Sequence, residues 1–217
     1  MPGVKQFDRA DVLDRAMALF WRRGYEATSI RDLVAATGIN RGSIYATFGD
    51  KKGLFLAVLE HYGEKVAKPL MAELGDPDPR RAIERMFESI IRRTSDSRFP
   101  RGCLNTNTSL ECPGSGDEIT RKIAEGFGRQ ESAIYRVLRR AEARRLLPPT
   151  LDARALARFF MAVAQGLNVV NKAVADPTIL QDIARVAMSV WGFGDGTRRH
   201  RNRIRGPSQG EHRQGGA

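Results

Sequence analysis

The chain has 217 residues, of which 41% are hydrophobic, so it can bury the core of one or two compact domains. Its 36 Lys and Arg residues exceed the 25 Asp and Glu residues, and the net charge of +11 favours a polyanionic partner, either nucleic acid or an anionic membrane surface. Two cysteines, Cys103 and Cys112, and three histidines are too few for a disulfide framework, a cysteine-rich zinc site or a Ser–His–Asp triad. We therefore expect no bound metal and no cofactor.

The first residues, MPGVKQFDRADVLDR, lack the apolar run of a signal peptide. No stretch of about 18 apolar residues, the length needed to cross a bilayer, occurs later in the sequence. We therefore expect a cytoplasmic protein that has no membrane partner.

Apolar residues recur at helical spacing through most of the chain, and no segment alternates in the way that a half-buried strand does. The sequence therefore predicts an all-α fold. The first helix begins after Asp8, a suitable cap, and ends at Gly24. With the short helices that follow, it is predicted to form an N-terminal three-helix DNA-binding domain over residues 6–66.

Residues 29–48, SIRDLVAATGINRGSIYATF, have the layout of a helix-turn-helix. Ser29 and Asp32 form a capping-box pattern at the first helix, and Gly38 allows the left-handed backbone of a tight turn. The second helix covers 41–48 and suits a DNA major groove, since it carries both small and hydrogen-bonding residues. These are Arg41, Gly42, Ser43, Tyr45, Ala46 and Thr47.

The second part of the chain is predicted to be a larger helical domain over residues 67–193, and the boundary lies a little before the break at 76–79. Gly126 and Gly128 are expected to kink or loosen one of its longer helices, because glycine is unfavourable inside a helix. Residues 194–217, rich in Arg and Gly, are expected to form a disordered basic tail.

The last two predicted helices, over 152–175 and 177–191, carry more apolar circumference than one helix pair in a monomer of this size needs. We expect them to form the interface of a homodimer. A central helix buried within one subunit is the alternative.

Residues 28–55, TSIRDLVAATGINRGSIYATFGDKKGLF, resemble the N-terminal signature of the TetR/AcrR family of bacterial transcriptional regulators. The resemblance rests on positions that match in register: Gly38, Gly42, Ile44, Tyr45, Phe48, Lys51 and Leu54. It implies a DNA-binding surface made of Thr28, Ser29, Asn40, Arg41, Gly42, Ser43, Tyr45, Thr47 and Lys51. Within this surface, Tyr45 and Lys51 suit phosphate oxygens, whereas Arg41 can address guanine through two hydrogen bonds.

Arg101-Gly102-Cys103-Leu104 resembles a stretch found in a branch of this family, some of whose members sense electrophiles or oxidants through the cysteine. A helix start and a neighbouring Arg101 favour thiolate chemistry at Cys103, and a buried, unreactive thiol is the alternative. Cys112 is out of phase with Cys103 on one helix, so a bridge between them is not expected. The family also implies a ligand cavity, for which the candidates are Phe87, Cys103, Asn107, Glu111, Phe127, Tyr135, Phe160 and Gln165.

The sequence thus predicts a homodimeric repressor that binds a double-stranded DNA operator and is released by an unknown small-molecule or thiol-reactive inducer. We expect it not to be an enzyme. A non-specific architectural DNA-binding protein is one alternative, although the basic excess of the N-terminal domain is modest for that function. A thiol-reactive or small-molecule enzyme with a DNA-binding module is the other.

Overall fold

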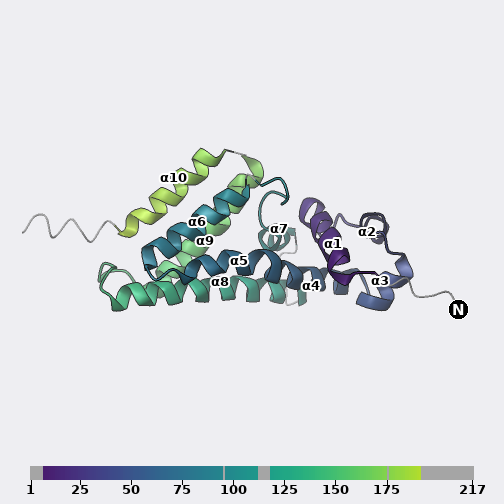
Figure 1. The fold of residues 1–217 in the computed structure, drawn as a ribbon, viewed down its shortest axis with the longest axis horizontal. Helices are drawn as coiled ribbons and strands as arrows, with labels where there is room; N and C mark the ends of the chain where they lie inside the picture. The colour runs from purple at the N-terminus through teal and green to yellow at the C-terminus, as the bar shows by residue number, and fades with distance from the viewer. Residues whose placement is uncertain (1–6, 95, 112–117, 175, 192–217) are drawn as a thin grey trace, which may run out of the picture.

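The computed structural model describes residues 7–94, 96–111, 118–174 and 176–191. Within these ranges the chain is helical and contains no strand, which confirms the predicted all-α fold (Figure 1). The α-helices are α1 (Arg9–Arg23), α2 (Ile30–Thr37), α3 (Arg41–Phe48), α4 (Lys51–Tyr62), α5 (Lys68–Ala72), α6 (Pro79–Thr94), α7 (Leu104–Glu111), α8 (Glu118–Ala143), α9 (Ala153–Ala173) and α10 (Pro177–Met188). Cys112 and the predicted tail, 194–217, lie outside the described residues.

The N-terminal helices begin where the sequence places capping side chains. The Asp8 carboxylate accepts a hydrogen bond from the Ala10 amide, and Ser29 and Asp32 form the complete predicted capping box. Asn40 and Asp50 cap α3 and α4 in the same way. Each cap satisfies amides that the first helical turn leaves without a partner, so these local signals define the helix starts without help from the rest of the fold.

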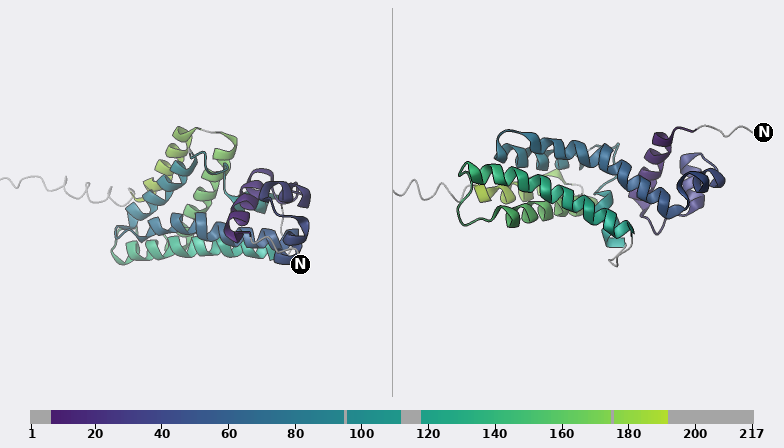
Figure 2. Two further views of the ribbon diagram at one scale, coloured as in Figure 1. Left: turned by 45° about the vertical axis from the view of Figure 1, so that its right-hand side comes forward. Right: turned by 90° about the horizontal axis from the view of Figure 1, so that it is seen from below.

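A continuous helical run joins the two parts of the molecule. After α4 it passes through a π-helical turn (Gly63–Ala67), α5 and a 3₁₀ turn (Glu73–Gly75). Figures 1 and 2 show this run lying alongside α8 for much of the length of the molecule. The predicted domain boundary at residue 66 falls inside the π-helical turn, so the two parts share a helix rather than a flexible linker.

Two apolar cores lie at opposite ends of this run. In the first, Phe20 and Phe55 meet edge to face, with ring centroids 4.7 Å apart. This core is completed by residues from α7 and α8, namely Leu104, Ile119 and Ile123. The second core joins α6, α8, α9 and α10 around Phe87 and Phe160, whose ring centroids are 5.9 Å apart. Thus α7, which follows α6 in the chain, contributes Leu104 to the first core and also bonds to α9 through Thr106 and Gln165.

The expected weakness in α8 does not interrupt the helix, which is continuous from Glu118 to Ala143 through Gly126 and Gly128 (Figure 1). A Cβ at Gly126 would lie 2.8 Å from the side-chain amide nitrogen of Asn105 on α7. The glycine therefore leaves room beside α8 for the Asn105 side chain, the end of which would have to move for a larger residue.

Several large apolar side chains remain exposed on the last two long helices. They include Phe159 and Val169 on α9 and Ile179 and Val186 on α10. No helix in the described part of the chain is long and apolar enough to cross a bilayer.

Candidate DNA-binding surface and regulatory cavity

The turn between α2 and α3 is fixed by backbone geometry and by buried side chains. Gly38 has φ 75° and ψ 4°, the left-handed conformation that the sequence predicts, and its amide donates to the Val34 carbonyl at 3.0 Å. Leu33 and Ile44 are fully buried on the inner sides of the two helices. The angle between α2 and α3 is therefore set by packing, and α3 is held rigidly at the surface.

Of the residues of α3 predicted to face the groove, Arg41, Gly42, Tyr45 and Thr47 are exposed, and Ser43 is half-buried. The Arg41 guanidinium donates to the Tyr45 hydroxyl at 3.1 Å and lies 5.2 Å from the centroid of its ring. A Cβ at Gly42 would come near the Asn40 side chain alone, at 3.3 Å. Packing within the protein therefore does not require a glycine at position 42.

Thr28 and Ser29, both predicted at the DNA surface, differ in position. Thr28 is 1% exposed; its hydroxyl donates to the Gly24 carbonyl at 2.6 Å, and its amide donates to the Tyr25 carbonyl at 3.3 Å. Ser29 is exposed and donates its hydroxyl to Asp32 at 2.6 Å. That hydrogen bond, with one from the Ser29 amide, holds the pKa of the Asp32 carboxyl below its ordinary value. The buried Thr28 thus supports the loop before α2 through its hydrogen bonds, whereas Ser29 is itself exposed at the surface.

Lys51, at the start of α4, reaches back to the end of α1. Its Nζ donates to the Tyr25 carbonyl at 2.9 Å and lies 4.3 Å from the centroid of the Tyr25 ring. The Tyr25 amide in turn donates to the Glu111 carboxylate at 2.8 Å. A Cβ at Gly24, which has φ 91°, would lie only 2.3 Å from that carboxylate. The last residue of α7 therefore contacts the same loop that positions Lys51.

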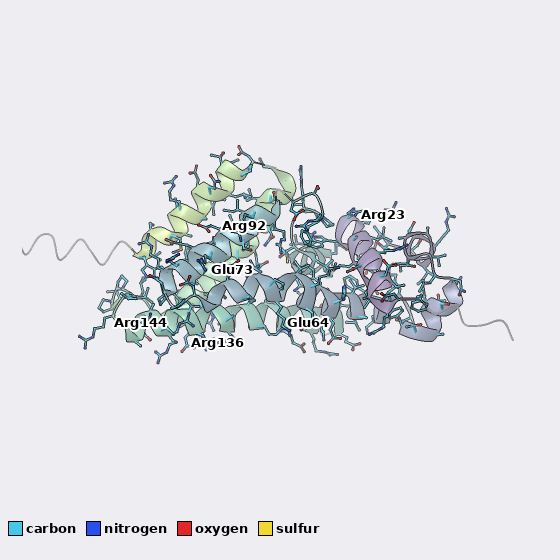
Figure 3. The ribbon with its side chains drawn as sticks, viewed as in Figure 1. Arg23, Glu64, Glu73, Arg92, Arg136 and Arg144 are labelled. Carbon is cyan, nitrogen blue, oxygen red and sulfur yellow. The ribbon has the colours of Figure 1, made fainter. Side chains whose placement is uncertain are left out.

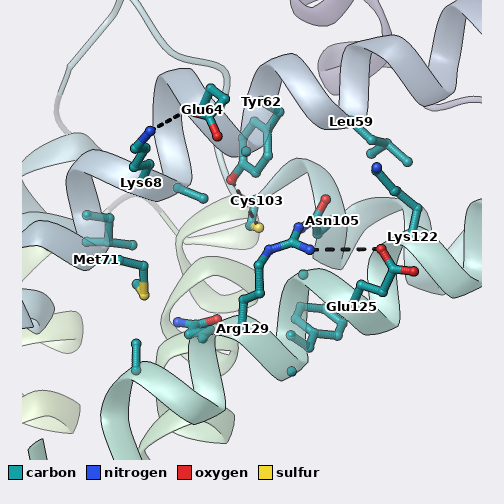
Figure 4. A pocket seen from close by; sticks show the side chains of 18 of the residues that line it. Leu59, Tyr62, Glu64, Lys68, Met71, Cys103, Asn105, Lys122, Glu125 and Arg129 are labelled. Carbon is teal, nitrogen blue, oxygen red and sulfur yellow. Dashed lines mark hydrogen bonds and ion pairs between the residues drawn. The ribbon is translucent and has the colours of Figure 1, made fainter. Parts of the chain in front are cut away.

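A cavity of about 1000 Å³ lies between the α4–α5 run and α8, with the start of α7 and the middle of α9 also lining it (Figure 4). Of the residues predicted to line a ligand cavity, Cys103, Phe127 and Gln165 do so. The Gln165 side chain is held in place, since it donates to Gln130 at 2.7 Å and accepts from the Thr106 hydroxyl at 2.6 Å.

Cys103 lies immediately before α7 and is 8% exposed. Its Sγ accepts a hydrogen bond of 3.2 Å from the hydroxyl of Tyr62, the last residue of α4 (Figure 4). The Tyr62 ring packs edge to face on Trp21 of α1, with centroids 5.1 Å apart. Burial raises the pKa of the Tyr62 phenol, so the hydroxyl keeps its proton and acts as a donor. The thiol thus lies where the cavity meets the N-terminal core.

The other five cavity candidates lie elsewhere. Phe87 and Phe160 pack in the C-terminal core, and Tyr135 lies beneath the Arg154 guanidinium, which is 3.7 Å from its ring centroid. Asn107 is buried on α7 near Gly102, and Glu111 is bonded to Tyr25. Helical spacing shows that a residue faces inward, but it does not say whether that residue meets a cavity or a neighbouring side chain.

Two residues that belong to no sequence motif, Tyr62 and Arg93, also line the cavity. Tyr62 reads as one more apolar position of α4, and Arg93 reads as a basic residue near the end of α6. Tyr25, which connects Lys51 with Glu111, lies in a loop without a motif. No pattern in the sequence identifies these residues, because each acquires its partner from a segment distant in the chain.

The chain matches known proteins along most of its length. The family profile described as "Bacterial regulatory proteins, tetR family" matches residues 12–58, and the profile "Tetracyclin repressor-like, C-terminal domain" matches residues 79–187. The HTH-type transcriptional repressor ComR of Escherichia coli is 36% identical over 191 residues, which cover 86% of this chain and 90% of ComR. The uncharacterized HTH-type transcriptional regulator YezE of Bacillus subtilis is 34% identical, over 86% of this chain and 97% of YezE.

A similar solved structure is that of the TetR family transcriptional regulator CifR, a cysteine mutant complexed with 26-bp double-strand operator DNA. It is 31% identical, with a TM-score of 0.79, and the match covers 88% of this chain and all of the CifR chain. Matches to both family profiles and to full-length relatives agree with the helix-turn-helix and with the larger helical part that follows it. The chain belongs to the TetR family of bacterial transcriptional regulators.

Proposed function

We propose that the protein is a homodimeric repressor that binds a near-palindromic double-stranded DNA operator through α3 and releases it when an inducer occupies the cavity. The observation that carries this proposal is the exposed face of α3, held rigidly by the buried contacts of Leu33 and Ile44. The relatives support it, since ComR is named a repressor and the CifR mutant structure is a complex with operator DNA.

Dimerisation supplies the geometry that such an operator requires, because two recognition helices must reach successive major grooves of the duplex. The apolar residues on α9 and α10 support an interface there; Val186 is 64% exposed and Val169 is 45% exposed. Exposed apolar residues grouped on one face mark association surfaces in soluble proteins.

Release follows from a change in the position of α3 relative to its copy in the partner subunit. The cavity borders α4 through Tyr62. Cys103, immediately before α7, also lines the cavity, and Glu111 at the end of α7 contacts the N-terminal domain. A ligand that fits the cavity better when α7 and α4 have shifted favours the state in which the two α3 helices of the dimer have the wrong spacing for the operator. It acts through its difference in affinity for the two states.

The test is fluorescence anisotropy with labelled duplex from the region upstream of the protein's own gene and with a scrambled duplex of equal composition, at two salt concentrations. We expect selective binding to the first duplex at both concentrations. Equal binding to both duplexes, with a steep dependence on salt, would contradict a sequence-reading repressor and favour the architectural alternative.

The dimer is tested by size-exclusion chromatography with light scattering on Val186→Glu, which places a charge on the exposed face of α10. We expect monomers and weaker operator binding. Leu110→Glu is the matched control, because Leu110 is 71% exposed but lies on α7. If both variants stay dimeric, the interface is not on this face.

A thiol-reactive inducer is tested with N-ethylmaleimide as the probe. We expect the parent protein and Cys112→Ser to lose operator binding after treatment and Cys103→Ser to retain it. Loss in all three proteins would exclude Cys103 from the response and leave non-covalent ligands as the inducers.

A further inference from the structure

The cavity carries positive charge that the described carboxylates do not neutralise. Three of its cations pair with glutamates: Lys68 with Glu64 at 2.7 Å, Lys122 with Glu60 at 3.6 Å and Arg129 with Glu125 at 3.9 Å. Two arginines of the lining, Arg93 and Arg136, form no ion pair among the described residues. Arg136 is exposed and projects outward from α8 (Figure 3), so Arg93 is the inner one.

Arg93 is held in a defined orientation. Its Nη2 donates to the Asn168 side-chain oxygen at 2.9 Å, and the Asn168 amide nitrogen donates to the Ala164 carbonyl at 2.8 Å. Because Asn168 is only 5% exposed and is bonded on both sides, its oxygen is fixed toward the guanidinium. A guanidinium has five N–H donors, so Arg93 keeps others that can bind a ligand.

Arg93 lines the cavity together with Tyr62 and Cys103. Burial is the largest influence on the Tyr62 phenol and raises its pKa, whereas the positive charge of Arg93 acts to lower it. Tyr62 in turn donates to Cys103. The remaining wall includes apolar residues, among them Leu59, Leu70, Met71, Phe127 and Ala133.

We infer that the cavity binds a small organic monoanion, a carboxylate with an apolar body, and that Arg93 receives the carboxylate. This inference rests on the proposed function, in which the cavity is the inducer site. Guanidinium and carboxylate geometries match through two parallel hydrogen bonds. A neutral ligand of the same shape would displace water from Arg93 without supplying a counter-charge, which is unfavourable for a partly buried cation. Among the described lining residues, the cations other than Arg93 and the exposed Arg136 pair with glutamates, so one unpaired inner cation suits a single negative charge.

The experiment measures binding to the full-length protein without DNA, by isothermal titration calorimetry. The probes are octanoate, octanamide and 1-octanol, which share a chain length and differ in the charge of the head group. We expect octanoate to bind at least about tenfold more tightly than the other two, since hydrogen bonds to charged groups contribute that much or more. Equal affinities for the three compounds, or no binding of octanoate, would overturn the inference.

Substitutions test whether Arg93 binds the carboxylate. Arg93→Met should lower octanoate affinity at least about tenfold and leave 1-octanol binding unchanged, whereas Arg93→Lys should retain part of the octanoate affinity. Arg92→Met is the matched control, because Arg92 lies beside Arg93 in α6, pairs with Glu73 and is outside this cavity. Unchanged octanoate affinity in a folded Arg93→Met protein would overturn the assignment.

A second readout separates this inference from the proposed function. Octanoate is added to the protein bound to its operator duplex, and release is followed by anisotropy. Selective octanoate binding that depends on Arg93 supports the site whether or not DNA is bound. Absence of selective operator binding would refute the proposed function alone, and Arg93-independent octanoate binding would refute the inference alone.

Discussion

Around the helix-turn-helix, the capping side chains have partners close in the sequence, whereas around the cavity the key side chains have partners far away. Ser29 and Asp32 bond to each other, and Asn40 caps the helix that follows it. At the cavity, Tyr62 meets Cys103 and Arg93 meets Asn168, 41 and 75 residues apart. The first region is therefore rigid and locally encoded, and the second depends on how whole helices pack.

The two regions also differ in whether their polar side chains find hydrogen-bonding or ionic partners within the protein. The Asp32 carboxylate accepts a hydrogen bond from the Ser29 amide, and Asn40 and Asp50 accept from amides in the first turns of α3 and α4, so the polar groups near the turn have fixed structural tasks. The inner guanidinium of the cavity has an amide partner and no carboxylate among the described residues. This difference is the one expected between a scaffold that presents a fixed surface and a site that receives a ligand.

The largest effect should come from removing the buried contact that locks the recognition helix. Ile44→Ala creates a cavity at a fully buried position, and we expect the free energy of unfolding to fall by about 2–5 kcal/mol. Urea denaturation followed by circular dichroism measures it. Thr47→Ala, on the exposed side of the same helix, should change stability by less than about 0.5 kcal/mol. Similar losses in both variants would mean that α3 is not anchored by its inner face.

Substitutions at the predicted DNA-binding surface should weaken DNA binding by about 1–3 kcal/mol and differ in their effect on specificity. Tyr45→Phe and Lys51→Ala are expected to weaken binding to all duplexes alike, because both residues are assigned to phosphates. Arg41→Ala should also relax the preference at one base position. A panel of single-base operator variants measures this. An unchanged preference in Arg41→Ala would show that the orientation proposed for α3 is wrong.

The contact between α7 and the N-terminal domain is tested by two glycines with positive φ. Gly24 and Gly49 have φ of 91° and 83° and differ in ψ, which is 165° and −62°, so alanine is strained at both by roughly 1–3 kcal/mol. Only at Gly24 would the new Cβ displace the Glu111 carboxylate, since nothing lies within 4 Å of that position at Gly49. We therefore expect Gly24→Ala to be the more destabilising and to blunt inducer response, as measured by thermal unfolding and operator release.

Equal effects of the two glycine substitutions on both readouts would remove Glu111 from the connection between cavity and DNA surface. Glu111→Gln provides an independent check, because it keeps the size of the side chain and weakens its hydrogen bond to the Tyr25 amide. Its operator affinity without inducer should stay close to that of the parent.

The smallest effect should be a dependence on acidic pH at Asp14, within α1. Burial alone would raise the pKa of Asp14, but hydrogen bonds from Lys65 and His61 outweigh it and hold the pKa below its ordinary value. Asp14 therefore stabilises the fold above pH 4, and the contribution is lost as the pH falls through its lowered pKa. The effect is small because the carboxylate is 35% exposed. Asp14→Asn should flatten the stability profile below about pH 4. A profile as steep as that of the parent would contradict this.

The sequence by itself determined the helix starts, the tight turn at Gly38 and the outer face of α3. These depend on interactions within a few residues, so capping side chains, a glycine and helical spacing are sufficient to predict them. The same local signals place the ends of α9 and α10 close to the predicted ranges, 152–175 and 177–191.

Only the tertiary structure decided what surrounds the cavity. Gly126 reads as a helix weakness in the sequence but proves to be the point where α7 approaches α8, and Glu111 reads as a cavity residue but bonds to the loop after α1. Arg93 reads as one charge of an exposed helix end, yet it lies inside with Asn168 as its partner. Each of these outcomes depends on which helices meet, because the partners are brought together by packing of the whole chain and not by spacing along it.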